Sequence, residues 1–162
     1  MNLYERQLKG KRTVLVQGAF EIIHGGHIKL LKFAQEQGDY LIVALNSDEL
    51  LVKYKGRLPV MPWEHKKEVL EGIRYVDEVV EAPEFSPLLL LAHHKVDVLV
   101  VADEWLSTKA AEIKFMDRAG GRVVVAPRFS EFSTTEIRKR LLAEAVGSTL
   151  SRDVVVGGEL HP

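Results

Sequence analysis

Residues 14–27 of the chain read VLVQGAFEIIHGGH. The run 14–16 is apolar without polar alternation, which is typical of a strand buried on both faces of a parallel sheet. A loop with three glycines follows, and Ile28, Leu31 and Ala34 then recur at the spacing of one helical face. This stretch therefore predicts a strand, a loop and a helix, in that order.

Four further apolar runs repeat the strand pattern, at residues 40–45, 77–80, 96–101 and 123–125. The segments between them have helical spacing, as in Leu70 with Ile73 and Ile113 with Met116, and residues 134–143 form the last candidate helix. Strands that alternate with helices indicate an α/β fold with a doubly wound, five-stranded parallel sheet of the Rossmann-like type.

Length and composition fit one domain without a basic surface. The 162 residues predict an N-terminal extension (1–12), one domain (13–144) and a C-terminal tail (145–162), with 154–156 as an edge strand of the tail. The 22 Lys and Arg against 23 Asp and Glu argue against a nucleic-acid or membrane partner. Without cysteine, signal peptide or membrane span, we expect a cytoplasmic protein.

Ligands of open parallel sheets bind beyond the carboxyl ends of the strands. After the first strand, His24 and His27 lie three residues apart at a predicted helix start, with Gly25 and Gly26 between them. This combination suits a polyphosphate. The helix start offers unpaired N–H groups, the glycines let an anion approach the backbone closely, and the two imidazoles can donate hydrogen bonds. The alternatives are a purely structural helix entry and a zinc site, although no third ligand lies nearby in sequence.

The segment GAFEIIHGGH resembles the G-x-F-D-x-x-H-x-G-H signature of the cytidylyltransferase-like nucleotidyltransferases, and within them the glycerol-3-phosphate cytidylyltransferases, over residues 13–140. The resemblance implies CMP transfer from CTP to a phosphorylated alcohol, with release of pyrophosphate. It also implies Mg²⁺ bound through nucleotide phosphates, with no metal ligand among the side chains, and a homodimer. The histidines His24 and His27 would be catalytic, and Gly18, Ala19, Phe20, Gly25 and Gly26 would contact the nucleotide.

Two lysines follow the second predicted strand, Lys53 and Lys55, one residue apart. They match a lysine pair of the family, which implies that Lys53 positions the acceptor and Lys55 the triphosphate. A solvated, lysine-rich surface loop is the alternative. Residues 74–79 match the family sequence R-Y-V-D-E-V near a subunit boundary, although a helix end entering a half-buried strand would explain their valines.

The last two strands are followed by further family motifs. Asp103 and Trp105 lie in a sequence similar to G-D-D-W, which implies contact with the base or the acceptor, the alternative being a capped turn. Residues 128–138 resemble R-x-x-x-I-S-T-T-x-I, and the implied triphosphate ligands are Arg128, Ser133, Thr134 and Thr135. A capping box from residue 133 to residue 136 explains only part of this motif. A hydroxyl-rich helix start would form a second phosphate site.

The chain departs from the family pattern at four positions. Glu21 replaces the Asp of the signature, Ala19 lacks a hydroxyl, Gly25 replaces a bulky aromatic, and Leu88 replaces a lysine that contacts the acceptor. We therefore expect a remodelled acceptor pocket. The alternatives are an adenylyltransferase of the ADP-heptose or FAD-synthesis type and a nucleotide-binding module without catalysis. The adjacent His93 and His94 are expected to face solvent.

Overall fold

The computed structural model describes residues 9–129 and 133–148. Five strands form one parallel sheet in the order β3-β2-β1-β4-β5. Their bounds are β1 (Thr13–Gly18), β2 (Tyr40–Asn46), β3 (Glu78–Ala82), β4 (Val98–Ala102) and β5 (Arg122–Ala126). The predicted doubly wound sheet is confirmed. The order reverses at β1, which therefore lies between the second and fourth strands, where such folds bind ligands.

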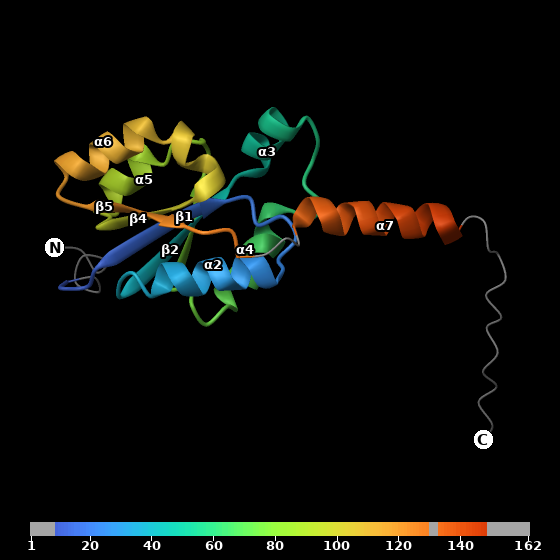
Figure 1. Cartoon of the computed structure of the whole chain (residues 1–162), viewed down its shortest axis with the longest axis horizontal. Helices are drawn as coiled ribbons and strands as arrows, with labels where there is room; N and C mark the ends of the chain where they lie inside the picture. The colour runs from blue at the N-terminus through green and yellow to red at the C-terminus, as the bar shows by residue number, and fades with distance from the viewer. Residues whose placement is uncertain (1–8, 130–132, 149–162) are drawn as a thin grey trace, which may run out of the picture.

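Helices cover both faces of the sheet. Their bounds are α2 (Gly25–Gln35), α3 (Asp48–Lys55), α4 (Trp63–Glu71), α5 (Leu88–His93), the 3₁₀ helix η1 (Asp103–Thr108), α6 (Ala110–Arg118) and α7 (Thr134–Ser148). Figure 1 shows α2 and α4 on one face and α5 and α6 on the other. The described part of the chain has no helix with the length and apolarity that a membrane crossing requires.

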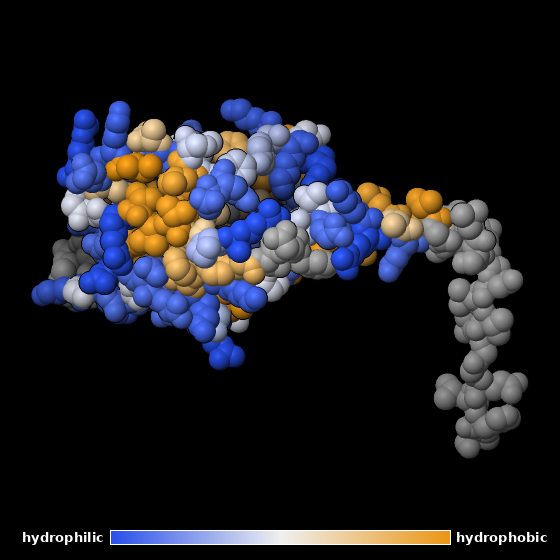
Figure 2. Space-filling view, viewed as in Figure 1, coloured by the Kyte–Doolittle hydropathy of each residue, from blue (hydrophilic) through white to orange (hydrophobic). Residues whose placement is uncertain are grey.

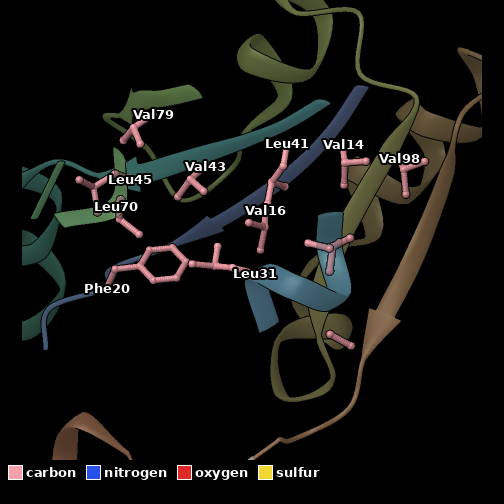
Figure 3. Packing of buried hydrophobic residues seen from close by; sticks show 13 residues of the cluster. Val14, Val16, Phe20, Leu31, Leu41, Val43, Leu45, Leu70, Val79 and Val98 are labelled. Carbon is pink, nitrogen blue, oxygen red and sulfur yellow. The ribbon is translucent and has the colours of Figure 1, made fainter. Parts of the chain in front are cut away.

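The core divides into two layers because side chains of a strand alternate between its faces. Val14 and Val16 of β1 belong to the layer under α2 and α4, together with Leu31, while Leu15 belongs to the layer under α5 and α6. Figure 3 shows the ring of Phe20 in the first layer, next to Leu31. The loop that follows β1 is thus anchored in the core by an aromatic side chain.

The segment 48–55 forms helix α3, which the sequence did not predict. The alternative interpretation of its lysines, a solvated surface loop, is therefore wrong about the backbone. The Ser47 hydroxyl accepts a hydrogen bond from the N–H of Leu50 at 3.1 Å, and Gly56 ends the helix with a left-handed φ of 67°. Asp48 and Glu49 in the first turn also favour the helix N-terminus. These local signals outweigh the high lysine content.

Helix α7 continues to Ser148, past the predicted helix end at residue 143 and the predicted tail boundary at 144. Figure 1 shows α7 extending away from the sheet, and Figure 2 shows apolar side chains on its outer half. Leu141, Leu142 and Val146 are exposed there. The predicted edge strand 154–156 lies outside the described residues, as do residues 1–8.

The prediction that both adjacent histidines face solvent is wrong for His94, whose exposed fraction is 8%. It forms the C-cap of the short helix α5 and packs edge-on against His93, with ring centroids 4.8 Å apart. Burial lowers the pKa of His94. His93 remains exposed, so the prediction holds for one of the two neighbours.

Candidate active site

The loop after β1 has a tightly constrained backbone. Phe20 adopts a positive φ of 42°, and its side chain is only 3% exposed. A Cβ atom at Gly18 would lie 2.8 Å from Cε2 of this ring, so the position requires glycine. Ala19 lies between the two, half-buried. The ring centroid of Phe20 is 5.1 Å from that of His27, so the buried aromatic side chain packs against the imidazole.

His24 and His27 form a stacked pair at the start of α2, with ring centroids 4.0 Å apart and an interplanar angle of 30°. His24 is the N-cap, and its Nδ1 accepts a hydrogen bond from the N–H of Gly26 at 3.1 Å. In the neutral ring the proton must therefore be on Nε2, which makes Nε2 a donor. Gly25 in the first turn is exposed and leaves open space beside the pair.

The two imidazoles differ in their surroundings. Burial lowers the pKa of His24. Burial, and next the proximity of His24, lower the pKa of His27 to about 4, against a smaller opposing effect of the Ile22 backbone. Both rings are consequently neutral near pH 7. At that pH they can act as hydrogen-bond donors without carrying a full charge.

The start of α7 lies against the same loop. The Thr134 hydroxyl donates to the carbonyl of Ile22 at 3.4 Å, across 112 positions of sequence. The Ser133 hydroxyl accepts from the N–H of Glu136 at 3.3 Å, as the capping box predicts. The structure therefore brings the histidine loop and the hydroxyl-rich helix start together at one edge of the sheet. Thr135 is exposed in the first turn.

Glu21 is the centre of a charged cluster that sequence reasoning missed. Its carboxylate is 1% exposed and accepts hydrogen bonds from Lys55 Nζ at 2.8 Å and from Arg57 at 2.6 and 3.0 Å. The N–H of Val60 at 3.1 Å and Arg138 Nη1 at 3.3 Å complete the set. Burial by itself raises the pKa of Glu21, but the hydrogen bonds from Arg57 and Lys55 outweigh it and lower the pKa to about 2.

The two lysines that the sequence paired have different surroundings. Residues two apart on a helix point in nearly opposite directions, about 160° apart around the axis. Lys55 contacts Glu21 next to the histidine loop, whereas Lys53 lines a shallow hollow on α3 with Asp48, Glu49, Val52 and Leu58. The structure therefore brings Lys55 into the charged cluster and places Lys53 on another side of the helix. Arg128 is exposed in the segment after β5.

An aromatic cluster lies at the ends of other strands. Trp105 of η1 and Phe85, which follows β3, both approach the ring of Tyr54 on α3, with centroids 6.3 and 4.7 Å away. Each of the three side chains is 41–44% exposed. Asp103 is exposed in the first turn of η1. The sequence signalled only Trp105, because the rings come from three separate segments.

Within residues 9–129 and 133–148, no group of three or more His, Asp or Glu side chains is arranged to hold a metal ion. The acidic side chain nearest to the histidines in sequence, Glu21, is already surrounded by cations. This donor set fits an anionic ligand and does not fit a cation bound directly by the protein.

Residues 15–140 match the model of the cytidylyltransferase-like family. The chain belongs to the cytidylyltransferase-like family. This cytidylyltransferase-like protein is therefore a nucleotidyltransferase, as its histidine motif predicts. It is 36% identical over 131 residues to the glycerol-3-phosphate cytidylyltransferase of Bacillus subtilis (strain 168), an alignment that covers 80% of this chain and 97% of that protein.

Two other similar proteins differ in how much of their length this chain covers. The chain is 38% identical over 136 residues to the bifunctional protein HldE of Psychromonas ingrahamii. This alignment covers 83% of the cytidylyltransferase-like protein but only 29% of HldE. A lipopolysaccharide core biosynthesis protein of Thermoplasma volcanium has the same fold, with a TM-score of 0.63 at 22% identity, over 76% of this chain and all of that one.

Proposed function

We propose that this enzyme transfers CMP from CTP to a phosphorylated alcohol resembling glycerol 3-phosphate. An oxygen of the acceptor phosphate attacks the α-phosphorus in line, a new P–O–P bond forms, and the bond from the α-phosphorus to the bridging oxygen breaks. Pyrophosphate leaves with the electron pair. A phosphate monoester is already ionised at neutral pH, so the reaction requires no general base.

One observation carries this proposal: the hydrogen bond from Thr134 to Ile22, which joins the start of α7 to the loop of the imidazole pair. Two sets of donors, one after β1 and one after β5, would then face one ligand at the carboxyl edge of the sheet. His24 and His27 would donate to the α-phosphoryl oxygens and the leaving oxygen, where negative charge grows during transfer. Neutral imidazoles suit this role because Nε2 of His24 carries its proton.

The other site residues keep the roles that the family motifs imply. Lys53 would position the acceptor phosphate, and Asp103 and Trp105 would contact the base or the acceptor. Lys55, Arg128, Ser133, Thr134 and Thr135 would bind the triphosphate. Mg²⁺ held by phosphate oxygens and water would neutralise part of the triphosphate charge when bound. A homodimer and a cytoplasmic location also remain predictions.

The second candidate is transfer of AMP from ATP to a sugar phosphate. The likeness to HldE favours it, because the alignment with that protein is as extensive as the alignment with the cytidylyltransferase. The Gly25 and Leu88 departures leave the acceptor open. A non-catalytic nucleotide-binding module would bind CTP or ATP and give no product.

The test is a matrix of CTP and ATP against glycerol 3-phosphate, other polyol phosphates and sugar 1-phosphates, read by pyrophosphate release. Turnover with CTP and a polyol phosphate is the expected result. Turnover with ATP alone would replace the cytidylyl proposal with the adenylyl one. Nucleotide binding by calorimetry without any turnover would support the non-catalytic module.

A further inference from the structure

The cluster around Glu21 has an excess of positive charge. One buried carboxylate contacts the ammonium of Lys55 and the guanidinium groups of Arg57 and Arg138. If all four groups are ionised, the cluster has two more positive than negative charges. Like charges this close repel one another unless an anion lies among them. Glu21 provides one negative charge, so the cluster has capacity for a further anion.

The three cations come from separate segments, and Glu21 contacts all three of them. Lys55 ends α3, Arg57 lies in the segment between α3 and α4, and Arg138 lies in the second turn of α7. Their sequence separations from Glu21 are 34, 36 and 117 residues. Oε1 accepts from both guanidinium groups and from the N–H of Val60, while Oε2 accepts from Arg57 and Lys55.

The cations also remain accessible. The side chains of Lys55, Arg57 and Arg138 are 27%, 34% and 31% exposed, while that of Glu21 is 1% exposed. The carboxylate thus holds the cations from the buried side, and their remaining N–H groups can reach a ligand from the solvent side. The guanidinium of Arg138 makes its contact at 3.3 Å, longer than the other pairs, so it is the one that moves most easily toward an anion.

We infer that Glu21 is a positioning residue that assembles Lys55, Arg57 and Arg138 into one anion-binding group, and that Arg57 and Arg138 bind the triphosphate together with Lys55. This inference rests on the proposed function for the identity of the anion. The inference also explains why a glutamate is present at position 21, because an aspartate would be shorter by about 1.5 Å and would lose some of these contacts.

The first experiment measures pyrophosphate binding to the full chain by calorimetry, comparing R138Q with R140Q. Both arginines lie on α7 and pair with a glutamate, Arg138 with Glu21 and Arg140 with Glu136, and each substitution removes one positive charge. We expect R138Q to weaken binding about fivefold or more and to reduce its salt dependence, with R140Q within about twofold of wild type. Equal effects of the two variants would overturn the inference.

The second experiment compares E21Q and E21D with E71Q, in which an exposed glutamate that pairs with Lys67 is neutralised. We expect E21Q and E21D to weaken pyrophosphate binding about tenfold and to raise KM for the nucleotide more than they lower kcat, while E71Q does neither. Lower thermal stability with unchanged pyrophosphate affinity would show a purely structural Glu21 and refute the inference. If the Glu21 variants do not fold, the comparison of R138Q with R140Q alone tests the inference.

The outcomes separate this inference from the proposed function. Wild-type protein that binds pyrophosphate through Arg138 but turns over no nucleotide would contradict the proposed function and support the anion-binding group. Full turnover of CTP in R138Q and R57Q, with wild-type KM, would support the proposed function and contradict the anion-binding group.

Discussion

Replacement of His27 by glutamine should change how the free energy of unfolding depends on pH. Burial and the neighbouring His24 lower the pKa of His27 to about 4, from an ordinary value of 6.5. Below pH 6.5 the unfolded chain therefore gains a proton that the native state resists. The native state is penalised progressively as the pH falls from about 6.5 to about 4.

The two pKa values set the size of this effect. At pH 5.5 the histidine is about nine-tenths protonated in the unfolded chain and almost neutral in the native state. This difference lowers the free energy of unfolding by about 1.4 kcal/mol relative to pH 8. Part of the ring is accessible to solvent, so we expect about 1 kcal/mol. Glu21 adds little in this window, because its pKa is already lowered to about 2 and its ordinary value is 4.5.

The assay is urea unfolding of wild type and H27Q at pH 8 and pH 5.5, at one ionic strength. From pH 8 to pH 5.5, the free energy of unfolding should fall by about 1 kcal/mol more in wild type than in H27Q. The burial of His94 affects both proteins alike, so the difference reports on the pair formed by His27 and His24. H65Q is the control, because the side chain of His65 is 67% exposed, and it should behave like wild type. Identical pH dependence in wild type and H27Q would show that the ring is not held neutral in the native state.

Four further substitutions test the site and the loop. H24A and H27A should each lower kcat by two decades or more, about 3 kcal/mol, measured by pyrophosphate release, because each removes a preorganised donor. G18A should destabilise the protein by about 1–3 kcal/mol in urea unfolding, since its Cβ would lie 2.8 Å from the Phe20 ring. K53A should raise KM for the acceptor and leave KM for CTP unchanged, in steady-state kinetics with each substrate varied.

The chain provides a control for the loop. G25A adds the same methyl group where no atom lies within 4 Å, so it should leave the free energy of unfolding within about 0.5 kcal/mol of wild type. If G18A were equally mild, the close approach of the aromatic ring would not constrain the loop. Unchanged kcat in either histidine variant would contradict the catalytic assignment. If K53A raised only the KM for CTP, Lys53 would be assigned to nucleotide binding and not to the acceptor.

Local patterns predicted much of the structure. The strand runs were placed to within two residues at each end, because a buried strand in a parallel sheet must be apolar on both faces. The start of α7 followed from Ser133 and Glu136, whose contact spans a single turn. Helix α3 was missed although Ser47 and Gly56 mark its two ends, because the lysines within it suggested a loop.

The sequence by itself determined the features that depend on local spacing. These are the alternation of strands and helices, and the two imidazoles three residues apart at the start of one helix. Tertiary structure alone decided which distant residues meet them. Glu21 gathers cations up to 117 residues away, and Tyr54, Phe85 and Trp105 meet from three segments. These contacts depend on the order of strands in the sheet, which places β1 between β2 and β4. Such an order is set by the packing of the whole core, and no short window of sequence contains it.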